Sequence, residues 1–178
     1  SVILASMTSD SNPFEISNSN FSYNAAKNNT IAFKQSWGSM VDCNLVDNEA
    51  VHYSENIFLS FSSLALTNVN FTKSLTESPY EELSSKSIQG DFLFISLGVE
   101  ITIRSSSFLN GLSEQGGAIF LSGLSTLTMS ECVLENNLAS QNGGGIYSTS
   151  YQLVNISNTA FRNNYAGWSG SEIYALFS

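Results

Sequence analysis

Few side chains in this sequence are of the types that perform catalysis, and they are scattered. The single histidine, His52, lies in a predicted loop and is interpreted as a surface residue. The two cysteines, Cys43 and Cys132, are too few to define a disulfide framework or a metal site. The basic residues are spread along the whole chain: Lys27, Lys34, Lys73, Lys86, Arg104 and Arg162. No Ser/His/Asp set can be argued from this distribution.

Two further groupings have ligand-binding residue types without the matching spacing. Glu77, Glu81 and Glu82 carry carboxylates that Ca²⁺ favours, but they fit no known cation loop, so we predict a solvated loop there. The Gly-Gly steps at 116–117 and 143–145 have no lysine nearby and do not follow the phosphate-loop pattern. We therefore predict that the chain is not an enzyme and has no catalytic residues, no cofactor and no metal.

Four asparagines stand in Asn-x-Ser/Thr sequences that can accept an N-glycan: Asn20, Asn28, Asn70 and Asn155. This number is close to chance for a chain with 19 Asn and 43 Ser or Thr, so the placement is more informative. Asn28 lies in a predicted loop. The other three each precede a residue that is predicted to point inward, so we expect them to face solvent. At least one glycan is expected if the host is a eukaryote.

The charge balance excludes several classes of partner. The chain has 178 residues, 15 acidic and 6 basic, and a net charge of −9. Binding to nucleic acid or to anionic lipid needs a basic surface, so neither is expected. No apolar run approaches the roughly 18 residues of a membrane span, and no membrane insertion is predicted. Ser, Thr and Asn make up 62 residues, while 12% aromatic residues supply enough apolar surface for a folded core.

An internal repeat organises the sequence. Each copy has an aliphatic residue, a polar residue two positions later, Phe or Leu five later, and Asn, Ser or Gly eight later. The aliphatic residues are Ile16, Met40, Leu66, Ile103, Met129 and Ile156, separated by 24 to 27 residues except for one interval of 37. A third apolar segment follows in each copy, at Ile31, Ile57, Leu93, Ile119, Ile146 and Ile173. The segments are short and flanked by turn-forming residues, so each is predicted to be a strand.

Three short strands in a period of about 25 residues predict an all-β fold, a single-stranded parallel β-helix. We expect about six coils of 24–27 residues with one longer insertion near 75–91, and one solenoid domain over 1–178. A leucine-rich repeat has a similar period, but this sequence lacks the regular leucines that it needs. Helical repeats are disfavoured because Gly, Ser, Asn and Thr are poor helix formers.

The motif Phe-x-x-Asn followed by Gly-Gly-Ala-Ile resembles the polymorphic outer-membrane protein repeats of microbial surface proteins. Phe21 to Asn24 and Phe161 to Asn164 match its first half, and Gly116 to Ile119 match the second. Close matches cover about residues 100–178, whereas earlier coils share only the hydrophobic pattern. The resemblance implies a right-handed β-helix and a role as an adhesin or surface protein. The C-terminal translocator barrel of a complete autotransporter is not found in this sequence.

Stacked coils turn each repeat position into a column with about 4.8 Å between neighbours. The Phe and Leu residues five positions after the anchors are predicted to stack inside the core. The column of 24, 48, 74, 111, 137 and 164 is predicted to form tight left-handed corners, with amides bonding from coil to coil. Asp42 and Glu131 share a column about 14 Å apart and cannot act on one bond. Cys43 and Cys132, similarly separated, are expected to be buried and unbonded.

One column suggests a contact surface. The residue after each third-strand aliphatic residue should point outward, and five of these six are aromatic: Phe58, Phe94, Phe120, Tyr147 and Tyr174, preceded by Ala32. A contiguous exposed aromatic stripe would fit a neighbouring chain, another part of the protein or a sugar. Cross-strand pairing, or cover by the 75–91 insertion, would equally explain it.

We expect a non-catalytic structural or adhesive module of a secreted or cell-surface protein that builds a filament or surface layer. The alternative is a carbohydrate-binding or polysaccharide-cleaving β-helix. Both ends read as open coils, so the segment is expected to continue into further coils of a longer chain or to stack head to tail. Protein is therefore the expected partner, with glycans as a second class.

Overall fold

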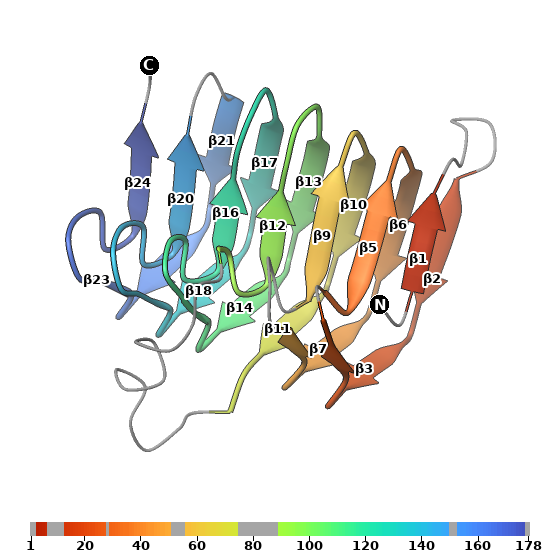
Figure 1. The fold of residues 1–178 in the computed structure, drawn as a ribbon, viewed down its shortest axis with the longest axis horizontal. Coiled ribbons are helices and arrows are strands. Elements are labelled where there is room, and N and C mark those ends of the chain that lie inside the picture. The colour runs from red at the N-terminus through yellow and green to blue at the C-terminus, as the bar shows by residue number, and fades with distance from the viewer. Residues whose placement is uncertain are drawn as a thin grey trace.

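The computed structural model describes residues 3–6, 13–27, 29–50, 56–74, 89–149 and 153–176. Within these ranges the regular structure is entirely β-strand. The strands pair in parallel from one turn to the next, and the chain winds as a right-handed solenoid (Figure 1). The predicted parallel β-helix is confirmed.

Three long sheets form the walls of the solenoid. The first sheet contains β2 (Phe14–Ser17), β6 (Trp37–Val41), β10 (Ser63–Thr67), β13 (Glu100–Arg104), β17 (Thr126–Ser130) and β21 (Leu153–Ser157). The second contains β3 (Asn20–Ser22), β7 (Asn44–Val46), β11 (Asn70–Thr72), β14 (Ser107–Leu109), β18 (Val133–Glu135) and β22 (Ala160–Arg162). The third contains β1 (Ile3–Ser6), β5 (Ile31–Lys34), β9 (Ile57–Ser60), β12 (Leu93–Ile95), β16 (Ile119–Leu121), β20 (Ile146–Thr149) and β24 (Ile173–Leu176).

The prediction of three strands per coil misses a fourth, very short strand. It lies between the second and third sheets and pairs with its equivalents in two separate groups. One group is β4 (Ala25–Ala26) with β8 (Glu49–Ala50), and the other is β15 (Leu112–Ser113), β19 (Leu138–Ala139) and β23 (Tyr165–Ala166). Two residues are too few to show an alternating pattern in the sequence.

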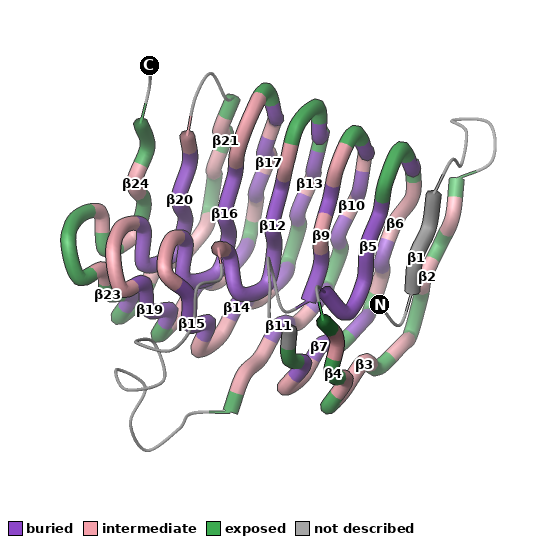
Figure 2. The backbone as a smooth tube through the Cα atoms, in the orientation of Figure 1, coloured by how far each residue is buried: buried purple, intermediate pink, exposed green. Residues whose placement is uncertain are grey.

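The predicted register is confirmed column by column. The six aliphatic anchors align across the first sheet, Ile16 with Met40 and so on to Ile156. The Phe and Leu column aligns across the second sheet from Phe21 to Phe161. In the middle coils, alternate residues of the first and second sheets are buried and belong to one core cluster, and Figure 2 colours these buried positions purple. The period-2 alternation of the sequence therefore reports the inner face directly.

The corner after the first sheet depends on two adjacent columns. A polar residue adopts a left-handed conformation in each coil: Asn18, Asp42, Asn68, Ser105, Glu131 and Asn158. In five of the six coils the small residue that follows bonds through its side chain to the carbonyl two residues earlier, and Val69 is the exception. Ser106 Oγ, for example, donates to Arg104 O (2.7 Å) and accepts from Val69 N–H (3.1 Å). Cys43 and Cys132 belong to this column and are buried and unbonded to each other, as predicted.

The expected left-handed conformation of the Asn column is wrong. The left-handed residue lies one position earlier, at Tyr23, Asp47, Asn110, Asn136 and Asn163. The expected coil-to-coil amide bonds are confirmed: Asn24 Nδ2 donates to Asn48 Oδ1, and Asn137 Nδ2 donates to Asn164 Oδ1, both over 2.9 Å. Asn48, Asn137 and Asn164 are buried, so this column is part of the interior.

Each buried Asn amide satisfies the backbone of the preceding coil at a corner. Asn137 Nδ2 also donates to Phe108 O (3.1 Å), while its Oδ1 accepts from Gly111 N–H (2.9 Å). Asn48 has the same two contacts, with Phe21 O and with Asn24 N–H. A buried backbone N–H or C=O without a hydrogen-bond partner costs free energy. At this corner the Asn side-chain amide provides the partner that a neighbouring strand provides elsewhere.

The insertion is shorter than the predicted range 75–91. Residues 75–88 lie outside the described part of the chain, but Gln89, Gly90 and Asp91 belong to the regular coil. Gln89 forms a β-bridge with Gln115, and Gly90 N–H donates to Gln115 O (2.9 Å). These three residues have no aliphatic anchor of their own, which is why the sequence pattern assigns them to the insertion.

Replacing Asn137 with Ala should lower the free energy of unfolding by about 2–6 kcal/mol, because two buried backbone groups lose their partner at roughly 1–3 kcal/mol each. Asn155→Ala is the matched control, since Asn155 is exposed on the outer face of β21, and should change stability by less than about 0.5 kcal/mol. Urea unfolding followed by circular dichroism measures both. Equal stability of the two variants would contradict a structural role for the Asn column.

Candidate functional site

The aromatic column lies on the outer side of the third sheet. Phe58, Phe94, Phe120, Tyr147 and Tyr174 pair in register, with Ala32 preceding them. Neighbouring rings stack with centroids 5.1–5.4 Å apart and planes within 20° of parallel. The rings form a cluster separate from the central core. The predicted outward direction and the contiguous stack are both confirmed.

The expectation that this stack is an exposed stripe is wrong for its middle. Phe94, Phe120 and Tyr147 are only 8%, 5% and 7% exposed, and Phe58 and Tyr174 are half-buried. A second layer of buried side chains therefore lies outside the sheet. A strand pattern shows which face a residue points to, but not what lies above that face.

A column of left-handed glycines runs along the base of the rings: Gly90, Gly116, Gly143 and Gly170. A Cβ on Gly90 would lie 2.8 Å from Phe120 Cβ, and one on Gly170 would lie 2.8 Å from Tyr174 Cβ. The positive φ and this close approach both require glycine. The corner before each third-sheet strand thus passes directly beside the aromatic column.

Two local effects act on the stack. Lys34 Nζ lies 5.7 Å from the centre of the Phe58 ring, within the range of a cation–π contact. Burial, and to a lesser extent the neighbouring Tyr174, raise the pKa of Tyr147 above the usual value of a tyrosine.

The Asn column is interrupted in the two coils that flank the insertion, where Ser74 and Gly111 replace Asn. A side chain at 111 has no room, because a Cβ there would lie 2.3 Å from Gly117 O and 2.8 Å from the Phe92 ring. Ser74 is bonded to the preceding coil instead. Its N–H donates to Asp47 Oδ1 (2.5 Å) and its Oγ donates to Asp47 Oδ2 (2.7 Å).

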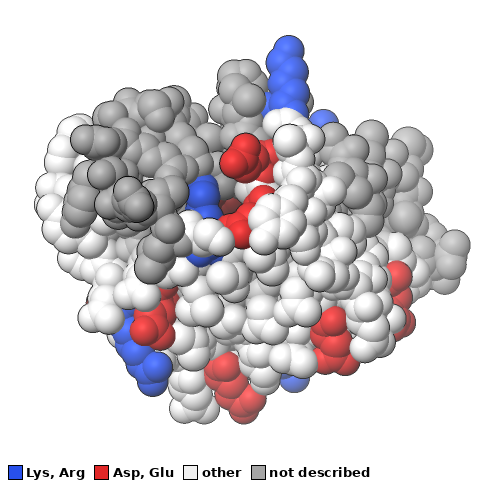
Figure 3. Space-filling view, turned by 90° about the horizontal axis from the view of Figure 1, so that it is seen from below, with Lys and Arg blue, Asp and Glu red and all other residues white. Residues whose placement is uncertain are grey.

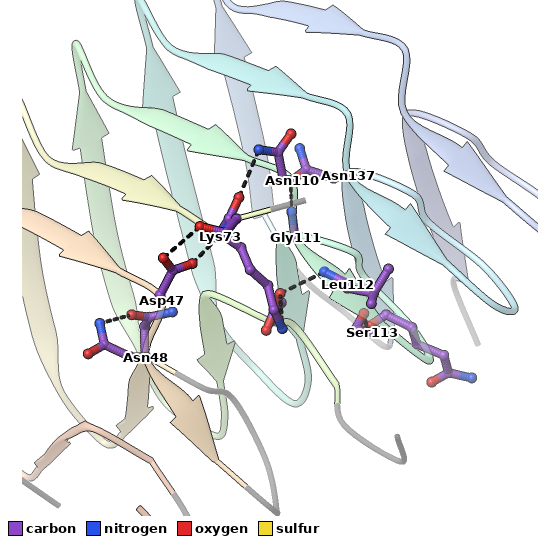
Figure 4. A network of polar contacts seen from close by, with 12 residues as sticks. Asp47, Asn48, Lys73, Asn110, Gly111, Leu112, Ser113 and Asn137 are labelled. Atoms are coloured by element: carbon purple, nitrogen blue, oxygen red, sulfur yellow. Dashed lines mark hydrogen bonds and ion pairs between the residues drawn. The ribbon is translucent and has the colours of Figure 1, made fainter. Parts of the chain in front are cut away.

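An ion pair lies at this interruption. Lys73 Nζ is 3.7 Å from Asp91 Oδ2, and the two side chains are only 11% and 0% exposed. The same Oδ2 accepts from Leu112 N–H over 2.6 Å. The backbone of Lys73 is held in turn by Asn110, whose Nδ2 donates to Lys73 O over 2.8 Å (Figure 4).

Sequence reasoning missed this pair. Asp91 lies two residues before Leu93, which pairs with Ile119 of the next coil, so Asp91 stands where that coil has Gly117. A charged residue at a position that is glycine in two following coils is the signal that the sequence contained. The sequence pattern places Asp91 in the insertion, where a charged residue is ordinary, so this signal is not recognised from the sequence.

The other candidate carboxylates are used in coil-to-coil contacts. Asn68 Nδ2 donates to Asp42 Oδ1 (2.6 Å), and Ser105 Oγ donates to Glu131 Oε2 (3.1 Å). Among the described residues no cluster of metal-ligating side chains occurs. Charged side chains on the face in Figure 3 are few, and both signs are mixed there. His52, Glu77, Glu81 and Glu82 lie outside the described residues.

The four predicted glycosylation sites differ in their surroundings. Asn20 and Asn155 are exposed. Asn70 is half-buried and lies in a polar row: its Nδ2 donates to Asn44 Oδ1 (3.1 Å), and its Oδ1 accepts from Ser107 Oγ (2.7 Å). Asn28 lies outside the described residues. In the folded chain a glycan therefore fits more easily at Asn20 and Asn155 than at Asn70.

Comparison with known proteins returned no significant match to a family sequence model, to a curated protein or to a solved structure. In the described part of the chain no helix is long and apolar enough to cross a membrane.

Phe120→Ala should lower the free energy of unfolding by about 3 kcal/mol, because it removes a buried ring from the middle of the stack. The control is Leu124→Ala, since Leu124 is 69% exposed, and its effect should stay within about 0.5 kcal/mol. Chemical denaturation of both variants measures the difference. If Phe120→Ala were as mild as the control, the stack would have no structural role.

Proposed function

We propose that this chain is a non-catalytic structural or adhesive module of a secreted or cell-surface protein, and that it acts by extending a β-helical rod. The support comes from the way the coils are joined. The strand columns of the three long sheets continue from coil to coil, so the fold has no preferred length.

The observation that carries this proposal is the exposed apolar face of the last coil. Ile173 stands in the same column as Ile119 and Ile146, which are 0% exposed, but it is itself 39% exposed. Ile156 of the first sheet is likewise half-buried, whereas Ile103 and Met129 in its column are 0% exposed. In the inner coils this surface is covered by the next coil, so the last coil offers a surface for another coil of the same kind.

The first and last coils match one another in type. Ile16, Phe21 and Asn24 of the first coil share columns with Ile156, Phe161 and Asn164 of the last. A coil with the side chains of the first coil would therefore extend the core and the Asn column. We propose that the surface binds either further coils of a longer chain or the first coil of a second copy.

A second copy has one additional requirement. Strand β1 already pairs with the outer edge of β5, so the third sheet has seven strands while the first and second have six. Suppose that β2 and β3 of the second copy stack on β21 and β22 of the first copy. Strand β24 of the first copy must then pair with β5 of the second copy, and it displaces the β1 that already pairs there. Further coils of one chain meet no such obstacle.

Carbohydrate binding on the aromatic column is not part of this proposal. A sugar needs accessible ring faces to stack on. The rings of Phe94, Phe120 and Tyr147 are at most 8% exposed and already stack on one another.

If the chain is secreted by a eukaryotic cell, mass spectrometry should find an N-glycan on Asn20 or Asn155. Both side chains are exposed. Asn70 is a less favourable site, because a glycan on its Nδ2 would compete with the hydrogen bonds that Asn70 makes to Asn44 and Ser107. An Asn155→Gln, Asn20→Gln double variant, secreted from the same cells, is the control for these two sites. Bare asparagines at both positions in the secreted wild type would remove the support that glycosylation lends to a surface location.

The chain should self-associate with rising concentration in sedimentation velocity. Ile173→Lys should weaken this association at least about tenfold, because one charge would be buried in the contact. The control is Leu124→Lys, which changes the net charge equally at an exposed position on a lateral corner. A wild type that stays monomeric would contradict a contact between copies and leave further coils of a longer chain as the occupant of this surface. Two variants that behave alike would also contradict an end-face contact between copies.

A further inference from the structure

The Lys73–Asp91 pair closes the base of the insertion. Lys73 follows directly after β11, and Asp91 lies two residues before β12, so residues 74–90 run between the two side chains. Nζ and Oδ2 are 3.7 Å apart. This is the one place in the described coils where a third-sheet strand does not follow closely on its second-sheet strand.

The surroundings of the Lys73–Asp91 pair are poorly suited to two separate charges. Asp91 has no exposed surface, and only 11% of the Lys73 side chain is accessible. Phe92, next to Asp91, is 1% exposed and packs against Phe71 and Phe108 with ring centroids 5.7 and 6.2 Å apart. Separated charges are poorly solvated in such a setting, and their neutralisation is favoured.

We propose that Lys73 and Asp91 condense to an intramolecular amide bond. Proton transfer within the pair gives a neutral amine and a neutral carboxylic acid. Nζ attacks Cγ, the C–O bond to Oδ1 breaks, and Oδ1 leaves as water with the acid proton and one proton from Nζ. The ammonium and carboxylate thus become one amide and one water molecule, so no oxidant, reductant or other reactant is consumed.

Two features of the site assist this reaction. Lys73 Nζ and Asp91 Oδ2 are held 3.7 Å apart, so the fold has already met part of the entropy loss of bringing an amine and a carboxyl together. The Leu112 N–H donates to Oδ2 over 2.6 Å, at the oxygen that becomes negative when Nζ adds to Cγ. The bond would join β11 to β12 covalently where the Asn column is interrupted.

The intact mass of the denatured chain tests the proposal. We expect a mass below that of the sequence by one water molecule, and a protease digest in which one branched peptide contains both Lys73 and Asp91. Full mass in the wild type would show an ion pair only and overturn the proposal. A loss of water mapped to any other residues would overturn it as well.

Variants assign the bond to this pair. Lys73→Arg and Asp91→Ala should each have the full mass of their sequences, because one reacting group is missing. Asp91→Asn should still form the bond, losing ammonia instead of water. Lys34→Arg is the matched control and should keep the loss of water. Loss of water in Lys73→Arg, or full mass in Lys34→Arg, would contradict the assignment.

Discussion

The structure depends on one constraint: every residue must suit the equivalent residues of the coils before and after it. Parallel strands stacked about 4.8 Å apart leave no freedom to shift one coil relative to the next. A residue type that works once therefore recurs, and a column is the unit of stability. The stacked Phe71 and Phe108 rings, 4.8 Å apart, are one result of this spacing.

The corners are where this constraint is most demanding. Strands satisfy their backbone groups through the neighbouring coil, but a corner turns the backbone away from its partners. Asn amides do this work at one corner, and Ser, Thr and Cys side chains do it at another. Both solutions use short side chains that bond to backbone atoms without adding bulk to the interior. The high Ser, Thr and Asn content of the chain follows in part from this need.

The interruption of the Asn column shows how the fold accommodates a departure from the repeat. Phe92 occupies the space beside Gly111, so Asn cannot stand there. The polar groups near the insertion are then supported by ionic side chains: Asp47 holds Ser74, and Asp91 lies beside Lys73 and accepts from Leu112 N–H. A local change of residue type is thus matched by a local change in bonding. The neighbouring coils keep the register of the strands.

The sequence by itself determined the strands, their register and the inner columns, because a period of about 25 residues combined with alternation leaves a single way to stack them. It also predicted that the aromatic column points outward and that the cysteines stay apart. Only the tertiary structure decided that Phe120 and Tyr147 are buried, because the alternation in the sequence of a strand does not show whether other residues cover its outer face. The same holds for the left-handed residues one position before the Asn column, for the two-residue strands, and for the meeting of Lys73 with Asp91. These features depend on contacts across the insertion or between corners, where neighbours in space are not set by the repeat.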